Sequence, residues 1–405
     1  MKKIINSFLF FIIAIASIAQ NQEMIIEKMK EEVTYLASDK LEGRATGTLS
    51  EKMAAKYISA KFLEYNLAEK GEDGYFQYFE AKIKENPHSD EIKKKITGTN
   101  VVGYINNKQE QTIIIGAHYD HLGYGDFGSL YDGQREIHNG ADDNASGVSI
   151  MLNLANSLKK IKDYNYLFIA FSGEEHGLFG SSYYAKNPTI NLQKVRYMIN
   201  FDMVGRLNKN KFLAINGIGT SDKWYNLINE ANEFDFKLKT TDSGIGPSDH
   251  TSFYLQNIPA IHFFTGQHED YHKPSDDAEK INFDGMYTIH EYVKNIIITS
   301  TEIKEFTFQE TKSDSTMTPK FTVTLGVMPD YLFDGKGMRI DGVSKGKTAE
   351  KFGILKGDIV TKIGDIDVLD MMDYMKGLSK FEKGDTTVVN VNRSNEIISI
   401  NIIFQ

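Results

Sequence analysis

The sequence predicts an α/β protein: a mostly parallel sheet with helices on both faces, followed by a small β-rich domain. Three observations support this prediction. Short apolar runs alternate with helical patterns between residues 112 and 299. A polar segment with few aliphatic residues follows at 306–320. Beyond it, residues 321–405 change to short strands separated by glycine-bearing turns.

The predicted elements of the large domain follow one another regularly. Continuous apolar runs predict four buried strands at residues 112–116, 166–171, 197–201 and 258–264. Helical periodicity predicts helices at residues 147–158, 176–185, 223–232 and 283–299. Upstream, we expect helices within residues 24–66 around a turn at 38–44, and a polar, lysine-rich surface excursion at 82–100.

The N-terminal residues have the pattern of a targeting segment. Two lysines precede a short apolar run at 8–15, and small residues follow at 17–19. This pattern predicts a secretory signal peptide over residues 1–19, and a protein that is exported to the periplasm or secreted. The alternative is an uncleaved anchor helix, but the run is too short to span a bilayer, so no stable membrane span is expected. The predicted domains are then a large one at 20–305, a linker at 306–320 and a small one at 321–405.

Composition excludes several classes of protein. The formal net charge is -9, and no basic patch of the kind that binds nucleic acid is present. The chain has no cysteine, which excludes disulfides, thiolate nucleophiles and thiolate metal ligands. Any metal ion must therefore be held by histidine and carboxylate side chains.

Histidines and acidic residues follow every predicted strand of the large domain. In open α/β sheets, ligands bind outside the carboxyl ends of the strands. Burying several carboxylates there is costly unless a cation neutralises them, and imidazole with carboxylate suits zinc or another first-row divalent ion. The candidate residues lie in the segments that follow the predicted strands, at 116–121, 139–147, 172–177, 202–205 and 271–277.

Each of these motifs alone has an ordinary structural explanation. A pair such as Asp142 and Asp143 commonly caps a helix, and Glu174 with Glu175 could simply begin one. What favours a functional interpretation is that such motifs recur at successive strand ends.

Residues 24–301 resemble the zinc aminopeptidase family that includes bacterial leucyl aminopeptidases and aminopeptidase Y (metallopeptidase family twenty-eight). The upstream Leu-Glu-Gly-Arg at 41–44 also fits this resemblance. The resemblance implies a zinc exopeptidase-like fold and hydrolysis of N-terminal residues from peptide substrates. The matching segments are Gly-Ala-His-Tyr-Asp at 116–120, Gly-Ala-Asp-Asp-Asn-Ala-Ser-Gly at 140–147, Gly-Glu-Glu at 173–175, Asn-Phe-Asp-Met at 200–203 and Tyr-His-Lys-Pro-Ser-Asp-Asp at 271–277.

The resemblance also implies a role for each candidate. His118 and Asp202 would bind one zinc ion, Glu175 and His272 would bind a second, and Asp143 would bridge the two Zn²⁺ ions. Glu174 would be the general base. Asp120 would orient His118, Asp276 would orient His272, and Tyr271 would steady the oxyanion.

The remaining histidines near these motifs are interpreted as structural or rim residues: His121, His138, His176, His250, His262 and His268. Ser248-Asp249-His250 only superficially suggests a serine triad, because no Gly-x-Ser-x-Gly nucleophile elbow accompanies it. We expect this segment to shape the pocket.

Residues 321–405 resemble a PDZ domain of the type found on bacterial proteases, most specifically at Gly-Ile-Leu-Lys-Gly-Asp-Ile-Val, residues 353–360. Such domains bind C-terminal peptides by strand addition, and residues 325–327 would form the carboxylate loop. The alternative is that this domain binds nothing and only packs on the peptidase.

Three other functions are compatible with part of this pattern. A carboxypeptidase or dipeptidase would need an arginine to clamp a substrate carboxylate, for which Arg206 and Arg135 are candidates. A glutaminyl cyclase would share the fold but use one zinc ion, and the full ligand set argues against it. A non-catalytic peptide-binding scaffold would lack a ligand or the base, and none is missing.

Overall fold

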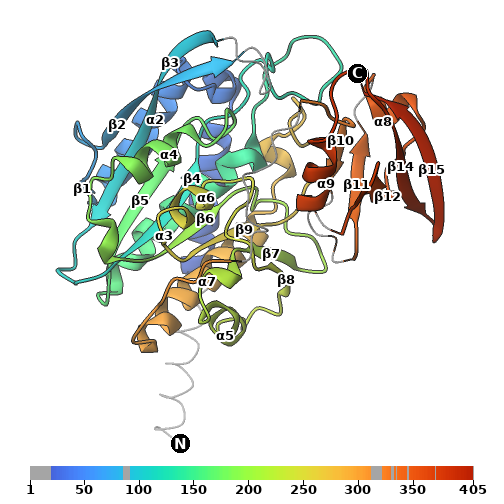
Figure 1. Ribbon diagram of the computed structural model, residues 1–405. Helices are drawn as coiled ribbons and strands as arrows, with labels where there is room; N and C mark the ends of the chain where they lie inside the picture. The colour runs from blue at the N-terminus through green and yellow to red at the C-terminus, as the bar shows by residue number, and fades with distance from the viewer. Residues whose placement is uncertain are drawn as a thin grey trace, which may run out of the picture.

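The computed structural model of the chain describes residues 20–84, 92–311, 322–329, 333, 335–343, 346–369 and 371–404 (Figure 1). The predicted signal peptide at 1–19 and residues 312–320 of the predicted linker lie outside these ranges. Within the described residues, no helix is long and apolar enough to cross a bilayer.

The large sheet combines parallel and antiparallel strand pairs. Its strand order is β1-β3-β5-β4-β6-β9-β7-β8, with β2 paired to β3. The four central strands β5, β4, β6 and β9 run parallel, whereas β3 and β7 join them antiparallel. The prediction of a mostly parallel sheet is therefore correct for the four central strands and for the pair β7–β8, and wrong for β1, β2 and β3. The bounds are β1 (Ala68–Glu69), β2 (Phe76–Lys84), β3 (Ile92–Ile105), β4 (Thr112–His118), β5 (Asn165–Phe171), β6 (Val195–Phe201), β7 (Phe212–Asn216), β8 (Lys237–Thr241) and β9 (Ala260–Phe264).

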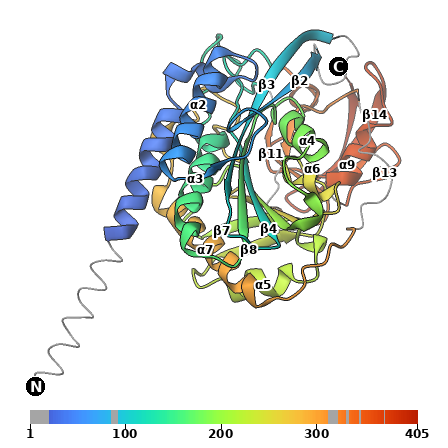
Figure 2. The same cartoon turned by 90° about the vertical axis from the view of Figure 1, so that its left-hand side faces the viewer.

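Helices cover both faces of this sheet, as predicted. Figure 2 shows α2 (Leu49–Glu64) and α3 (Gly147–Ser157) on one side and α4 (Phe179–Lys186) with α6 (His250–Tyr254) on the other. The helix α7 (Phe283–Thr299) packs on α3 and has the predicted bounds, and α5 (Trp224–Glu230) packs on α7. Because both faces are covered, every residue of β4 and β5 is buried, which explains their continuous apolar runs.

The lysine-rich stretch at 82–100 is not a surface excursion. Its described residues belong to β2 and β3, which pair antiparallel from Phe76 opposite Val101 to Lys84 opposite Ile92. Exposed Lys95 and Thr97 flank buried Ile96, which is the alternation of a half-buried strand. The density of lysines hid this pattern. The strands β7 and β8 were also not predicted, and β8 is a polar edge strand.

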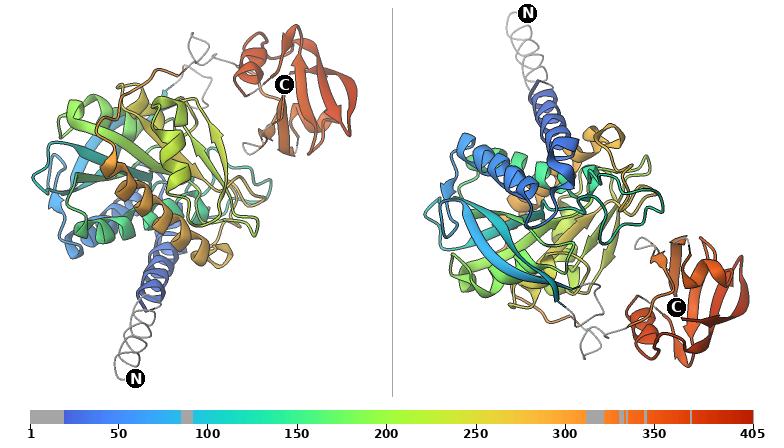
Figure 3. Two further views of the ribbon diagram at one scale, coloured as in Figure 1. Left: turned by 90° about the horizontal axis from the view of Figure 1, so that it is seen from below. Right: turned by 90° about the horizontal axis from the view of Figure 1, so that it is seen from above.

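A second, antiparallel sheet is formed by the C-terminal residues (Figure 3). Its hydrophobic core shares no residue with the core of the large sheet. The helix predicted to end at Gly353 and the helix predicted from Met371 to Leu378 are both present. The bounds are β10 (Val327–Pro329), β11 (Met338–Val343), α8 (Thr348–Lys351), β12 (Ile359–Ile363), β13 (Ile366–Asp367), α9 (Met371–Leu378), β14 (Thr386–Arg393) and β15 (Glu396–Ile403).

The first part of the segment predicted as a linker lies against the large sheet's helices. The ring of Phe306 packs edge-on against Trp224, with 4.6 Å between the centroids. The backbone N–H of Gln309 donates to the carbonyl of Thr220, and that of Thr311 donates to the hydroxyl of Tyr254.

Glu32 is a fully buried carboxylate that joins the helix at residues 20–36 to α3. Its side chain accepts hydrogen bonds from Ser149 and Asn153 at 2.7 and 2.8 Å, and from Tyr65 at 3.2 Å. Burial raises the pKa of Glu32 from 4.5 to about 7, against the opposing effect of these hydrogen bonds. The folded protein thus binds this proton more tightly than the unfolded chain does.

We expect Glu32→Gln to stabilise the protein at pH 8 but not at pH 4.5. The stability that Glu32 contributes is greatest below pH 4.5 and is lost as pH rises through 7. Glutamine keeps the hydrogen bonds and cannot ionise. The gain in free energy of unfolding of Glu32→Gln over the wild type should therefore grow between pH 4.5 and pH 8 to roughly 3 kcal/mol. Urea unfolding at several pH values measures this, with exposed Glu31→Gln as the matched control. If Glu32→Gln changed the free energy of unfolding equally at every pH, the raised pKa assigned to Glu32 would be wrong.

Candidate metal centre

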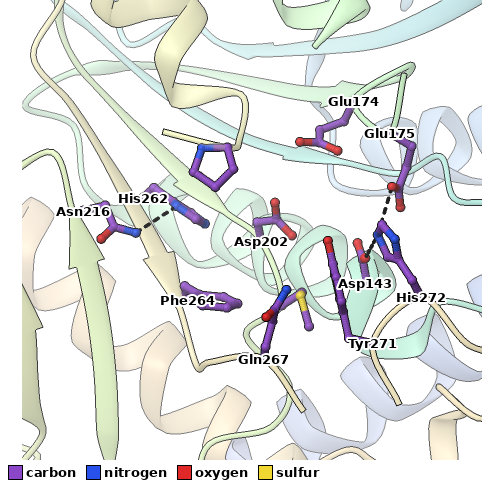
Figure 4. A pocket seen from close by; sticks show the side chains of 12 residues that line it. Asp143, Glu174, Glu175, Asp202, Asn216, His262, Phe264, Gln267, Tyr271 and His272 are labelled. Carbon is purple, nitrogen blue, oxygen red and sulfur yellow. Dashed lines mark hydrogen bonds and ion pairs between the residues drawn. The ribbon is translucent and has the colours of Figure 1, made fainter. Parts of the chain in front are cut away.

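The five predicted metal ligands converge at one edge of the large sheet, and Figure 4 shows four of them, Asp143, Glu175, Asp202 and His272. Four of them lie at or beyond the carboxyl ends of the parallel strands: His118 ends β4, Glu175 follows β5, Asp202 follows β6, and His272 lies on the loop after β9. The fifth, Asp143, lies in the turn Ala141–Ser146 that leads into α3. Parallel strands end at the same edge, so residues far apart in sequence meet there.

Asp143 lies between two pairs of these side chains. Its Oδ1 is 3.4 Å from Nε2 of His118, which is itself 3.3 Å from Oδ1 of Asp202. Its Oδ2 is 3.3 Å from Nε2 of His272, which is 3.2 Å from Oε2 of Glu175. One carboxylate oxygen therefore faces each pair, which is the arrangement expected of a bridging ligand between two metal ions.

Asp120 connects the first histidine to the loop of the predicted base. Its backbone carbonyl lies 3.2 Å from Nδ1 of His118, and its carboxylate Oδ1 lies 3.6 Å from the same nitrogen. That carboxylate also accepts hydrogen bonds from the hydroxyl of Thr46 and the backbone N–H of Glu174. Contacts of this kind fix the ring orientation of a metal-binding histidine.

Asp276 does not orient His272. The Nδ1–H of His272 instead donates to the carbonyl of Gly128 at 2.8 Å, which leaves Nε2 directed at Asp143 and Glu175. The carboxylate of Asp276 accepts the backbone N–H groups of Asp142 and Asp143 at 2.9 and 3.0 Å. It therefore positions the turn that carries the bridging carboxylate.

His121 lies inside the cluster, although the sequence suggested a structural or rim residue. It is buried, and its Nδ1 is 2.7 Å from Oε1 of Glu175 and 3.9 Å from Oδ2 of Asp143. His121, Asp143 and Glu175 form one group with the spacing needed to hold a cation, and His118, Asp143 and Asp202 form another. The three-residue spacing between His118 and His121 was the signal that could have identified it.

Ser248 supports Asp202 from the segment that precedes α6. The amide of Asn200 donates to the hydroxyl of Ser248 at 2.8 Å, which leaves that hydroxyl to donate to Asp202. Ser248 therefore contacts a predicted metal ligand, which fits the expectation that residues 248–250 shape the pocket. In this contact Ser248 is a hydrogen-bond donor and not a nucleophile.

A buried arginine lies beneath the cluster. The guanidinium of Arg44 donates to the carbonyls of Tyr119, Leu36, Asn139 and Gly140 at 2.5 to 3.0 Å. The tight turn before it requires glycine, because Gly43 has a φ of +69° and a Cβ there would lie 2.5 Å from the carbonyl oxygen of His138. Arg44 thus joins the chain segments that lead into Asp120 and Asp143.

The electrostatics of the cluster fit a bound cation. Burial raises the pKa of Glu174 well above its usual range, and it also raises that of Asp143. Burial lowers the pKa of His118 and His272, but nearby carboxylates outweigh it and raise both well above 6.5. Burial thus disfavours the ionised carboxylates of the cluster, and a cation held there would offset this cost. Nitrogen and oxygen ligands without thiolate suit zinc, so the residues present fit this metal.

Two hollows of different size meet at the cluster. The smaller has about 550 Å³ of empty space and the larger about 1340 Å³. Both are lined by Glu174, Glu175, Tyr271 and His272, so the candidate catalytic groups lie at their junction. The ring of Tyr271 stacks on that of His272, with 3.9 Å between the centroids.

The fold is that of the zinc exopeptidase-like α/β proteins. A Zn-dependent exopeptidase from Parabacteroides distasonis aligns with a TM-score of 0.55 at 18% identity, over 68% of this chain and 97% of that one. A glutaminyl cyclase from Porphyromonas gingivalis aligns with the same TM-score at 17% identity, over 67% of this chain and 97% of that one. Both likenesses concern the fold alone.

The sequence comparisons find similarity to peptidases. Residues 100–297, slightly less than half of the chain, match the model described as Peptidase family M28. Aminopeptidase YwaD of Bacillus subtilis (strain 168) is 31% identical over 226 residues, which span 53% of this chain and 46% of that relative. The alignment thus covers less than half of the curated relative.

Proposed function

We propose that the chain is an exported two-zinc aminopeptidase that removes N-terminal residues from peptides. The observation that carries this proposal is the lining of the smaller hollow. Four carboxylates line it, those of Asp143, Glu174, Glu175 and Asp202, whereas its lining contains no lysine or arginine. A free ammonium group fits such a hollow and a terminal carboxylate does not. The larger, more open hollow leaves room for the rest of the chain.

The two arginines considered for a carboxypeptidase form ion pairs with carboxylates outside both hollows. The guanidinium of Arg206 pairs with Asp270 at 2.7 Å, and that of Arg135 pairs with Asp126 at 2.8 Å on the exposed surface. Neither arginine lines either hollow. The residues that line the smaller hollow therefore favour the amino end of the substrate.

The proposed mechanism assigns one task to each side chain. His118 and Asp202 would hold one zinc ion, Glu175 and His272 the other, and Asp143 both. Bound zinc supplies Lewis acidity, which lowers the pKa of a coordinated water and polarises a carbonyl. Glu174 accepts the proton of the attacking water and delivers it to the leaving amine. Tyr271, at the junction of the hollows, donates a hydrogen bond from its hydroxyl group to the developing oxyanion.

The test is hydrolysis of tripeptides by the zinc-loaded protein, followed by mass spectrometry. We expect loss of the N-terminal residue, inhibition by a chelator, and no cleavage of the same peptides after N-acetylation. Loss of ammonia from an N-terminal glutamine without residue loss would instead support a cyclase. Absence of any reaction with free N-termini would overturn the proposal, and metal analysis of the same sample would show whether two zinc ions had bound.

Export is part of the proposal and rests on the pattern of residues 1–19. Cell fractionation with N-terminal sequencing of the mature protein tests it. A mature chain that starts near residue 20 and lies outside the cytoplasm is the expected result, and a cytoplasmic full-length chain would contradict it.

The C-terminal sheet is proposed to bind C-terminal peptides as a PDZ-like unit. Gly326 has a φ of +72°, and the carbonyl of Leu325 is tied to the backbone N–H of Ala349, so the 325–327 loop precedes β10 as a formed turn. Among the described strands, β10 pairs with β11 alone and leaves an edge for strand addition. Titration of the full chain with free-acid and amidated peptides tests this. Saturable binding that amidation abolishes is expected, and its absence would favour a purely structural unit.

A further inference from the structure

The larger hollow has a largely apolar wall that neither the predicted metal ligands nor the base form. We call it the apolar wall, and it consists of Phe127, His176, Leu178 and Phe179. All four residues are only half-buried and line the hollow, so a bound molecule can reach them. The proposed mechanism assigns no task to any of them.

Three rings of the apolar wall pack against one another. The centroid of the His176 ring lies 4.9 Å from that of Phe127 and 6.5 Å from that of Phe179. Both separations lie within the range of favourable aromatic contacts. Phe127 lies on the loop between β4 and α3, whereas His176 and Phe179 follow β5. The ring contacts therefore join two separate loops into one surface.

A short hydrogen-bonded turn holds the apolar wall beside the candidate base. The backbone N–H groups of Gly177 and Leu178 donate to the carbonyl of Glu174 at 2.8 and 3.0 Å. The backbone N–H of Phe179 donates to the carbonyl of Gly173 at 2.9 Å. Because Glu174 lines the same hollow, the wall begins next to the place where the reaction would occur.

Leu178 has a backbone conformation that leucine rarely adopts. Its φ is +61°, in the left-handed region where glycine and asparagine are the common residues. A leucine at this position disfavours folding relative to either of those residues, yet its side chain lines the hollow. Backbone strain in such a place points to a side chain that serves binding.

We propose that the apolar wall binds the side chain of the second residue of the substrate, and that the enzyme prefers peptides in which this residue is large and apolar. The inference rests on the proposed aminopeptidase function, in which the free amino group occupies the smaller hollow and the scissile carbonyl lies at the junction. The second residue then enters the larger hollow at the wall. Contact there removes apolar surface of both molecules from water, which is favourable in proportion to its area.

Other side chains match the apolar wall less well. Asparagine has nearly the shape of leucine, but its amide would lose water against the rings of Phe127 and Phe179, which offer no hydrogen bond in return. A lysine side chain would enter a hollow that already holds Lys82, the one lysine or arginine among the described residues that line either hollow. Alanine is too short to cover much of the wall.

The experiment compares kcat/KM of the zinc-loaded protein for Ala-X-Ala peptides in which X is Phe, Leu, Asn, Lys or Ala. We expect the wild type to prefer Phe over Ala, and Leu over Asn, by about tenfold, the value of burying roughly half of a large apolar side chain. Phe127→Ala should lower the Phe-to-Ala ratio to about threefold or less. Leu178→Asn should lower the Leu-to-Asn ratio, and it should fold at least as well as the wild type because asparagine tolerates the left-handed backbone.

Tyr131→Ala is the matched control. Tyr131 is an exposed aromatic residue on the same loop as Phe127, and it lines neither hollow. Its substitution should leave both ratios unchanged. The inference is overturned if the wild type cleaves the five peptides equally well, or if Phe127→Ala and Leu178→Asn keep the wild-type ratios. If the zinc-loaded wild type cleaves no peptide of the series, the aminopeptidase proposal has failed and the inference fails with it.

Discussion

Glu174→Gln should reduce kcat by about 10²- to 10⁴-fold, which is the usual contribution of a positioned general base. Glutamine has nearly the same shape as glutamate but cannot accept the proton of the attacking water. Burial and the carboxylates of Asp202 and Glu175 already raise the pKa of Glu174 well above its usual range, so this side chain is suited to holding a proton. Steady-state hydrolysis of the best tripeptide measures the effect.

Zinc content decides how this result is interpreted. The ion pairs that define the cluster join His118, Asp143, Glu175, Asp202 and His272, and Glu174 is not among them. The variant should therefore bind as much zinc as the wild type. Loss of zinc would make Glu174 a ligand, and a nearly unchanged kcat with full zinc would remove it as the base. Glu269→Gln, an exposed change on the loop that carries Tyr271, is the control and should leave kcat unaffected.

Arg44→Met should lower the free energy of unfolding by roughly 3–5 kcal/mol, as expected when one partner of a buried charged network is removed. The substitution leaves the carbonyls of Leu36, Tyr119, Asn139 and Gly140 without their donor. It also removes a cation close to Asp143 and Asp120. Burial lowers the pKa of Arg44 to about 10, so the side chain is still charged at neutral pH.

Urea unfolding followed by circular dichroism measures this loss, and two further variants test its cause. Arg44→Lys keeps the charge but cannot reach all four carbonyls, so an intermediate loss is expected. Arg135→Met removes an exposed arginine that pairs with Asp126, and it should leave unfolding close to that of the wild type. Equal effects at the two arginines would contradict the role assigned to Arg44.

Much of the fold could be predicted because its signals are local. The buried strands β4 and β5 appear as apolar runs, since both of their faces are covered by helices. The helix α7 could be predicted from its apolar periodicity alone. The strands β3 and β8 could not, because exposed lysines and threonines mask the alternation of a half-buried or edge strand. Pairing with a distant segment, not local composition, decides that these residues are strands.

The sequence by itself predicted that histidines and acidic residues following successive strands would meet, because parallel strands place their carboxyl ends at one edge. The choice of His118, Asp143, Glu175, Asp202 and His272 among them was implied by the resemblance to the zinc aminopeptidase family. The sequence also determined that these ligands must be nitrogen and oxygen, since the chain contains no cysteine. Only the tertiary structure placed His121 beside Glu175, moved Asp276 from His272 to the Asp142–Asp143 turn, and showed Arg44 beneath both. Those contacts join residues up to 134 positions apart in the chain, so no local pattern records them.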